Sequence, residues 1–157
     1  MVSRCPLVVA ALTSLAFAAC ANPSSPAENG PVRLRGAISQ STIARGDTAT
    51  MTFRLENITT TNVVLNFTSG CNILPYINDR PSGQVVYPSG GGWGCTAALT
   101  SLELRAGGAK TVDVVVRAAD AASSGSVALK PGQYDAYATL EDTNYRLRSA
   151  TISFTVQ

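Results

Sequence analysis

Hydrophobic and polar residues alternate along most of the chain from residue 32 onward, in short runs that end at Gly, Pro, Asn or Asp. The clearest run covers residues 48–55, with apolar residues at every second position: Ala49, Met51, Phe53 and Leu55. Because successive side chains of a strand point to opposite faces, this run predicts a strand with one buried and one solvated face. Similar runs predict further strands at 63–67, 72–79, 84–87, 99–104, 112–116, 134–141 and 150–156.

These runs together predict an all-β fold, a single antiparallel immunoglobulin-like β-sandwich of about eight or nine strands. The runs at 49–55 and 63–67 flank a polar turn, and we expect them to be adjacent antiparallel strands. Pro75 lies within a predicted strand, which indicates an edge strand or a bulge. Residues 118–127 are small and polar, and we expect a loop there with at most one short helical turn.

Composition supports this class and removes several functions. A chain of 157 residues is the size of one domain, and its low content of charged residues (14%) favours strands over solvated helices. The Lys and Arg residues are scattered, so we predict neither nucleic-acid binding nor a polybasic membrane patch. The chain has no His, which excludes Ser-His-Asp and Cys-His hydrolases and all metal sites built on imidazole.

The first 19 residues have the three-part pattern of a secretory signal peptide: a cation (Arg4), an apolar stretch at 6–17 and then small residues. The apolar stretch is too short to span a bilayer comfortably. Residues 17–20 read Phe-Ala-Ala-Cys and resemble a bacterial lipobox, in which Cys20 would receive diacylglycerol, with palmitate as an expected acyl chain. The alternative is ordinary signal-peptidase cleavage after Ala18 or Ala21.

Residues 20–31 are rich in Asn, Pro and Ser, a composition that cannot bury a core and predicts a flexible tether after the lipidated Cys20. Residues 32–157 would then form the sandwich domain. We therefore expect an exported protein, anchored to a membrane through its lipid on the outside of the cytoplasm. Ala21, in place of Asp, resembles the pattern that is sorted to the outer membrane, where the domain would face the periplasm.

Of the four cysteines, Cys5 leaves with the leader and Cys20 would carry the lipid, so Cys71 and Cys95 remain. Export to an oxidising compartment predicts a disulfide between them. On the chain-entropy estimate such a bond stabilises the fold by roughly 3 to 4 kcal/mol. The alternative is a pair of free or reactive thiols. A zinc site or a redox motif is not expected, because the chain has no His and neither residue lies in a Cys-x-x-Cys motif.

Several motifs between residues 48 and 156 follow one another in a recognisable order. They are Val-x-Leu-x-Phe-x-Ser-Gly at 63–70, Gly83 with Val86-Tyr87, Leu104 with Gly107-Gly108, and Leu-x-Pro-Gly-x-Tyr at 129–134. This series resembles the BsuPI-type proteinase-inhibitor domain, which implies an immunoglobulin-like fold and inhibition of a protease. The chain departs from that pattern in Cys71, Cys95 and an intervening Gly-rich loop, and founding members of the family are described as intracellular.

The last of these motifs has a physical role of its own. Pro131-Gly132 makes a tight corner, and Tyr134 just beyond it can bury its ring while its hydroxyl bonds to the backbone. We expect a tyrosine corner here, which stabilises the fold and carries no activity.

The residues offer little for catalysis. Glu141 and Asp142 are the only adjacent carboxylates, and we expect them in a solvated turn because neighbours on a strand face opposite ways. Ser and Thr are abundant, but Lys110 and Lys130 are the only alternative bases to the missing His. We predict no enzyme activity, no catalytic residue, no metal and no cofactor.

Aromatic residues are the better candidates for binding, because Trp and Tyr supply much of the energy at protein interfaces. Trp93, Tyr87 and Tyr76 are the predicted partner-binding residues, although Trp93 could instead fold back as a cap over the sandwich. The leading hypothesis is a non-catalytic envelope lipoprotein, a binding or structural module that contacts another envelope protein. The alternative is a proteinase inhibitor that acts through the Gly-rich loop or the extended segment at 72–87.

Overall fold

The computed structural model describes residues 30–121 and 123–157, and every regular element in these ranges is a β-strand. In chain order the strands are β1 (Val32–Ile38), β2 (Thr42–Ile43), β3 (Thr48–Asn57), β4 (Val63–Phe67), β5 (Ile73–Asp79), β6 (Val85–Tyr87), β7 (Thr100–Leu104), β8 (Ala109–Ala118), β9 (Ser126–Leu129), β10 (Gly132–Glu141), β11 (Arg146–Arg148) and β12 (Ile152–Val156). The predicted leader and Cys20 lie outside the described residues. Within the described part of the chain, no helix could span a membrane.

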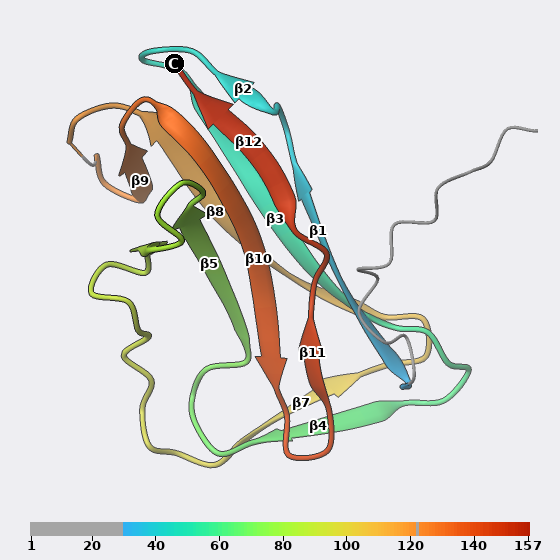
Figure 1. Ribbon diagram of the computed structural model, residues 1–157. Helices are drawn as coiled ribbons and strands as arrows, with labels where there is room; N and C mark the ends of the chain where they lie inside the picture. The colour runs from blue at the N-terminus through green and yellow to red at the C-terminus, as the bar shows by residue number, and fades with distance from the viewer. Residues whose placement is uncertain (1–29, 122) are drawn as a thin grey trace, which may run out of the picture.

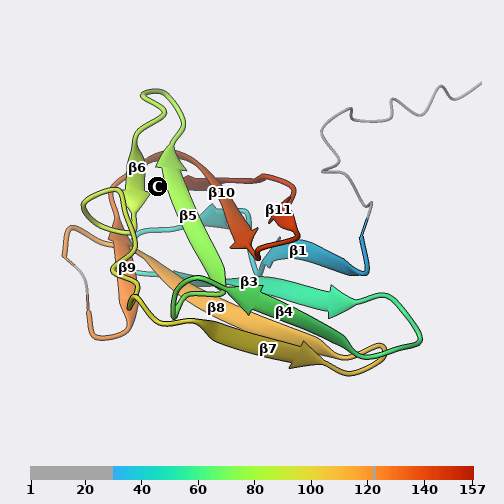
Figure 2. The same cartoon turned by 90° about the horizontal axis from the view of Figure 1, so that it is seen from below.

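The strands form two sheets that face each other, and a separate two-stranded ribbon lies across one end of them (Figures 1 and 2). The first sheet has the order β1-β3-β8-β9. The second has the order β2-β12-β10-β5-β6, with β11 also paired to β10. The ribbon consists of β4 and β7. This arrangement confirms the predicted all-β class and agrees with a β-sandwich.

The core lies between the two sheets and is built from the apolar positions that alternate along the strands. Phe53, Met51 and Leu55 of β3 face Ile77 of β5 and Leu140 of β10, and each of these side chains is at most 1% exposed. Full burial of side chains of this size contributes roughly 1.5–3 kcal/mol each. The period-2 pattern in the sequence thus predicted which face of each long strand is buried.

The predicted pairing of the strands at 49–55 and 63–67 is wrong. Strand β3 pairs with β1 and β8, whereas β4 pairs with β7. The connection between β3 and β4 carries the chain out of the first sheet, and the buried side chain of Asn57 stabilises this change. Its amide donates to the carbonyl oxygens of Thr61 (2.7 Å), Leu104 (3.0 Å) and Arg105 (3.0 Å). The alternation of apolar and polar residues indicates which face of a strand is buried, but it does not indicate which strand pairs with it.

The sheets are also mixed, where purely antiparallel pairing was expected. The short strands β2 and β9 pair in parallel with β12 and β8, respectively. The region 118–127, expected to be a loop, holds the last residue of β8 and the start of β9, and its described residues form no helix. Strands of two to four residues are too short to show a period, which is why the sequence did not predict them.

The tyrosine corner is present as expected. The hydroxyl of Tyr134 donates to the carbonyl oxygen of Lys130 at 2.8 Å, and its ring stacks on Phe154 with the centroids 5.4 Å apart. Burial raises the pKa of this hydroxyl above its usual value, with a smaller contribution from Asp79. The corner connects the start of β10 to the preceding turn.

Candidate functional site

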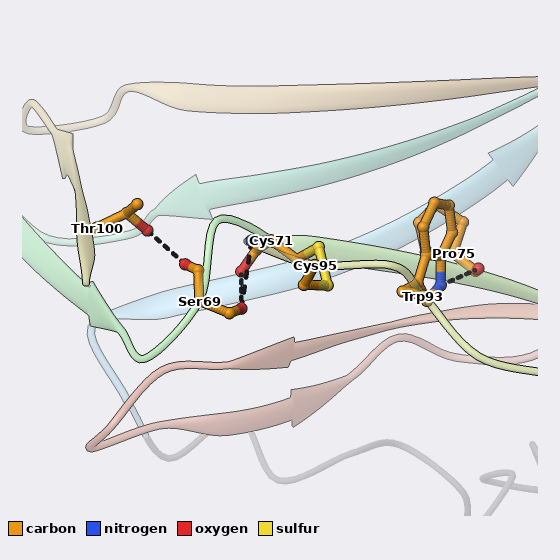
Figure 3. Close-up of a disulfide and its surroundings, with 6 residues drawn as sticks. All are labelled: Ser69, Cys71, Pro75, Trp93, Cys95 and Thr100. Carbon is orange, nitrogen blue, oxygen red and sulfur yellow. Dashed lines mark hydrogen bonds between the residues drawn. A yellow bond between two sulfur atoms is a disulfide. The ribbon is translucent and has the colours of Figure 1, made fainter. Parts of the chain in front are cut away.

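Two connections on the same side of the fold are joined by a disulfide. One is the β4–β5 connection (residues 68–72) and the other is the long β6–β7 connection (residues 88–99). Cys71 from the first and Cys95 from the second are bonded, with their Cα atoms 5.5 Å apart (Figure 3). The predicted disulfide is therefore confirmed.

Hydrogen bonds extend this attachment to either side of the disulfide. The N–H of Gly70 donates to the carbonyl oxygen of Thr96 at 2.9 Å. A Cβ atom at residue 70 would lie 2.2 Å from the hydroxyl oxygen of Thr96, so any larger residue would force the Thr96 side chain to move. On the other side, the hydroxyl of Thr100 donates to the carbonyl oxygen of Ser69 at 2.7 Å (Figure 3). Residues 69–71 thus hold the chain at 95–96 and again at 100.

The residues between these two attachments are exposed. We call residues 96–99 the braced segment, and all four of its side chains are exposed. The N–H of Ala98 donates to the carbonyl oxygen of Thr96 (2.9 Å), which makes a tight turn. Leu99 is 87% exposed, whereas the next most exposed large apolar side chain of the described residues, Val64, is 54% exposed. The segment therefore displays a leucine on a backbone that is fixed at both ends.

Trp93 packs against the sandwich. Its indole N–H donates to the carbonyl oxygen of Pro75 at 3.2 Å (Figure 3). Its ring meets that of Tyr87 edge to face, with the centroids 5.4 Å apart. Strand β10 pairs with one edge of β5 along its length, whereas β6 pairs with the other edge only at Ile77 and Asn78. The indole therefore covers a stretch of that second edge that has no strand beside it. The structure thus shows Trp93 as a cap, and its role in binding a partner stays a prediction.

Tyr76 lies on a different face from the other two predicted partner-binding residues. Ile77 points into the core, so its neighbour Tyr76 points to the outer face of the second sheet. There it stacks on Tyr137 at 5.3 Å, and the guanidinium of Arg148 lies 3.7 Å from the centre of the Tyr137 ring. Burial raises the pKa of Tyr76, and the charge of Glu141 adds to this. Tyr87 instead packs against the core, and burial raises its pKa as well.

A family comparison identifies the domain that carries these features. The sequence profile of the family described as "BsuPI: Intracellular proteinase inhibitor" matches residues 37–145, which include both joined connections and the braced segment. The chain belongs to the BsuPI family. The motifs quoted from the sequence lie largely within the matched residues and predicted this membership.

Comparisons with other proteins add little to the BsuPI assignment. Curated proteins gave no match. Among solved structures, the chain is similar to a β-glucosidase from Erythrobacter marinus (12% identity, TM-score 0.46, 80% of this chain and 15% of that one). It is also similar to an alkylpurine DNA glycosylase from Pseudomonas fluorescens (16% identity, TM-score 0.43, 81% of this chain and 30% of that one). A third similar structure is a β-glucosidase from Listeria innocua (14% identity, TM-score 0.40, 80% of this chain and 16% of that one). The chain thus spans less than a third of each of these proteins, and at these TM-scores no argument rests on them.

Leu99 is the site residue that the sequence analysis did not single out. It was included in the strand predicted at 99–104, but β7 begins at Thr100 and pairs there with Phe67. The exposure of Leu99 could have been predicted from the alternation of the strand, because Leu102 and Leu104 stand at even positions and face inward. An odd-numbered residue of the same run points the other way.

The acidic pair has a structural role that differs from the expected solvated turn. Asp142 is only 2% exposed. One of its carboxylate oxygens accepts the N–H groups of Asn144 (2.8 Å) and Tyr145 (3.0 Å), and the other accepts the N–H of Asn66. The carboxylate thereby fastens the outer edge of β4 to the turn that follows β10. Glu141, by contrast, is exposed.

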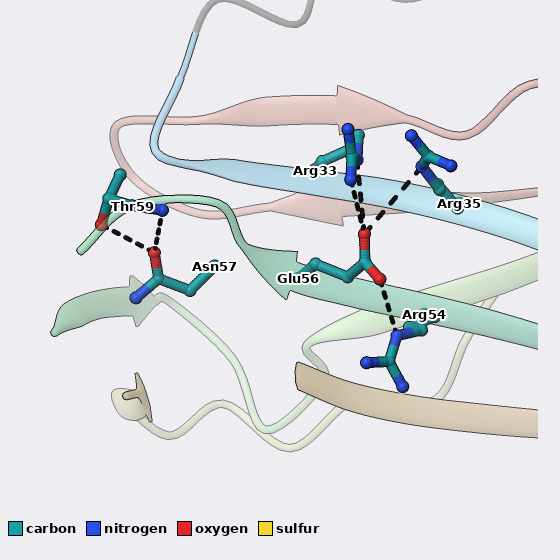
Figure 4. Close-up of polar contacts among 6 residues, drawn as sticks. All are labelled: Arg33, Arg35, Arg54, Glu56, Asn57 and Thr59. Carbon is teal, nitrogen blue, oxygen red and sulfur yellow. Dashed lines mark hydrogen bonds and ion pairs between the residues drawn. The ribbon is translucent and has the colours of Figure 1, made fainter. Parts of the chain in front are cut away.

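An arginine cluster occupies the outer face of the first sheet (Figure 4). The carboxylate of Glu56 accepts bonds from Arg54 (2.8 Å) and Arg33 (3.0 Å), and Arg35 lies 3.9 Å away. These bonds, led by that from Arg54, lower the pKa of Glu56 below its usual value. Strand pairing brings the three cations together, which their scattered sequence positions did not indicate. Exposed ion pairs of this kind stabilise a fold little.

A hollow at another place in the described residues offers little for chemistry. One hollow of about 330 Å³ is lined by Arg45, Asp120, Pro131, Gln157 and two alanines, with a single carboxylate among them. In residues 30–121 and 123–157, no three Cys, Asp or Glu side chains are grouped so that they could hold a metal ion. The braced segment, with the disulfide beneath it, is the best candidate for contact with another molecule.

Proposed function

We propose that this BsuPI domain inhibits a proteinase by binding it through the braced segment, without catalytic chemistry of its own. Membership of the family described as an intracellular proteinase inhibitor is the observation that carries this proposal. The matched residues contain the disulfide and both connections that it joins.

The geometry of the braced segment suits an inhibitor. Protease–inhibitor complexes bury about 800 Å² on each partner and form with little movement of the interface backbone. A loop that is already fixed loses little conformational entropy on binding, which favours high affinity. The disulfide and the bonds of Gly70 and Thr100 supply this fixation.

Inhibition can be tested with the full mature protein and a panel of serine, cysteine, aspartic and metallo-proteinases. The residual hydrolysis of peptide substrates is measured at micromolar inhibitor. We expect at least one proteinase to lose most of its activity, with a dissociation constant below about 1 µM. Unchanged activity across the whole panel would refute the proposal.

We also propose that the inhibitor works outside the cytoplasm, anchored through Cys20. The lipobox-like residues 17–20 and the Cys71–Cys95 disulfide support this, because disulfides persist in oxidising compartments. The family is described as an intracellular proteinase inhibitor, and export would distinguish this chain from that description.

The anchor is tested by fractionating cells that express the wild type or Cys20→Ser. We expect the wild type in the membrane fraction and extractable only by detergent, with the variant released or left unprocessed. Recovery of both forms in the soluble fraction would exclude the lipid anchor and leave the inhibition proposal untouched.

The outer face of the second sheet favours a second candidate, binding of another envelope protein. Tyr76, Tyr137 and Arg148 form a layer there, and Tyr and Arg are enriched where proteins meet. Crosslinking in intact cells, with Tyr137→Ala as the variant, tests it. Equal yields of every crosslinked product from the wild type and the variant would exclude this face.

A further inference from the structure

We infer that Leu99 is the side chain that this inhibitor inserts into the substrate pocket of its target, and that the target cleaves after large apolar residues. The pocket meant is S1, which holds the side chain on the amino side of the scissile bond and sets the specificity of a protease. This inference rests on the proposed function and adds the residue and the class of proteinase to it.

The first argument is the exposure of Leu99. The side chain is 87% exposed, and its backbone is held by the pairing of Thr100 with Phe67 on one side and by the attachment of Thr96 to Gly70 on the other. A single exposed leucine on a mobile loop would mean little, because it could turn back onto the surface. Here Thr100 begins a strand whose alternation directs residue 99 away from the core. The fold therefore keeps this apolar side chain in water, where only a partner can bury it.

The second argument is that a single short stretch holds the chain on both sides of the Leu99–Thr100 bond. Residues 69–71 are attached to the amino side through the Cys71–Cys95 disulfide and the Gly70–Thr96 hydrogen bond. The same stretch is attached to the carboxyl side through the hydroxyl of Thr100. If a proteinase cut the bond between Leu99 and Thr100, both new ends would stay in place. A substrate held in this way is released slowly and blocks the enzyme.

The surroundings leave room for a proteinase. Ala97 and Ala98 precede Leu99, and their small exposed side chains offer no obstacle. Strand β7, which follows, pairs only with β4 in the part of the chain that the structure describes. Its other edge is available for the backbone of a partner, the mode in which one chain adds an extended segment to another.

Other exposed segments fit less well. Residues 89–92 read Ser-Gly-Gly-Gly and offer one small side chain to a pocket. At the β5–β6 turn, Arg80 is engaged by Asp135 at 2.7 Å. Val64 is exposed on β4, but it lies within a strand that is paired along its length. Among the described residues, Leu99 has the most exposed large apolar side chain (87%, against 54% for Val64 and 45% for Ile58). Its backbone is also attached on both sides, and its apolar character selects an apolar pocket.

The test uses the full mature protein with Leu99→Ala and Leu99→Lys, and Val64→Ala as the matched control. Inhibition constants are measured against chymotrypsin, whose S1 pocket is apolar, and trypsin, whose pocket carries a carboxylate. We expect Leu99→Ala to weaken inhibition of the apolar-pocket enzyme by at least about 100-fold. Leu99→Lys should shift inhibition toward trypsin, while Val64→Ala should stay within about threefold of the wild type.

A second readout is the site of slow cleavage. During long incubation, hydrolysis breaks the C–N bond between Leu99 and Thr100. Water supplies the hydroxyl of the new Leu99 carboxyl group and a proton of the new Thr100 amine. Mass spectrometry should then show the mass of one added water, and two fragments that separate only after denaturation.

The outcomes separate this inference from the function on which it rests. If the wild type inhibits an enzyme and both Leu99 variants inhibit it equally well, Leu99 is not the inserted residue and inhibition itself stands. Inhibition by the wild type of trypsin alone would overturn the apolar specificity. If the wild type inhibits no proteinase in the wider panel, the proposed function fails and this inference fails with it.

Discussion

Asn57 shows how one amide side chain can hold two parts of a fold together. It is 2% exposed, and its N–H groups serve three carbonyl oxygens while its own oxygen accepts from the N–H and the hydroxyl of Thr59 (Figure 4). From the sequence, Asn57 was expected to end a strand and begin a polar turn, and no buried role was predicted for its side chain. Its role depends on Leu104 and Arg105, which lie far along the chain and come near only through the fold.

Substitution of Asn57 by Ala should therefore destabilise the protein by about 2 to 4 kcal/mol, because several buried polar groups lose their partner together. Urea unfolding followed by circular dichroism measures this. Thr59→Ala is the control and should cost less than about 1.5 kcal/mol, because Asn57 keeps its three carbonyl contacts. Equal losses for the two variants would show that the amide does not hold the ribbon.

Two carboxylates with lowered pKa values predict a dependence of stability on pH. The hydrogen bonds of Arg54 and Arg33 lower the pKa of Glu56, and that of Arg80 lowers the pKa of Asp135. A group whose pKa is lower in the folded state stabilises that state fully above its unfolded pKa. The stabilisation is lost as the pH falls through the folded pKa.

The free energy of unfolding, measured with urea, should accordingly decrease as the pH falls below the ordinary carboxyl pKa values, which are 4.5 for Glu and 3.8 for Asp. The double variant Glu56→Gln, Asp135→Asn should show a shallower fall over that acidic range. Added salt should also reduce the difference, because both pairs are partly exposed. Identical pH profiles of the wild type and the variant would contradict this assignment.

At the scale of the elements, the long strands were predictable and their partners were not. The alternation at 134–141 predicted one buried face, and the structure confirms that its residues are buried: Tyr134, Ala136, Ala138 and Leu140. The neighbours of β3 depend on contacts with β1 and β8, which no local pattern encodes. The disulfide was predictable because elimination left only two cysteines, whereas the exposure of Leu99 required knowledge of where β7 begins.

Removal of the disulfide by Cys71→Ser with Cys95→Ser should lower the free energy of unfolding by about 3 to 4 kcal/mol on the chain-entropy estimate. It should also weaken inhibition, since the braced segment would keep only its hydrogen bonds to residues 69 and 70. Urea unfolding and inhibition assays are compared at a temperature where the variant is folded. Unchanged inhibition by the folded variant would show that the disulfide serves stability alone.

At the scale of the whole molecule, the fold extends beyond the part that defines the family. The match covers residues 37–145, yet β12 (Ile152–Val156) supplies Phe154 and Val156 to the core. Strand β12 also pairs with both β10 and β2. The last residue continues this network, because the N–H of Gln157 donates to the carbonyl oxygen of Ile43 at 2.9 Å.

A fragment limited to residues 37–145 should therefore fail to fold, because the loss of β12 and most of β1 exceeds the 5–15 kcal/mol by which domains are typically stable. The full mature chain should give a dispersed amide NMR spectrum and a cooperative thermal transition. A well-dispersed spectrum from the fragment would show that the core does not need its terminal strands.

The contact between Trp93 and Pro75 has a consequence for behaviour in concentrated solution. An uncovered strand edge can recruit the edge of another molecule and start self-association. The indole occupies the carbonyl group that a foreign strand would otherwise engage. Trp93→Ala should therefore leave a soluble protein at low concentration but promote aggregation as the concentration rises, which light scattering would detect. A residue that first suggested recognition of a partner thus also protects the protein from copies of itself.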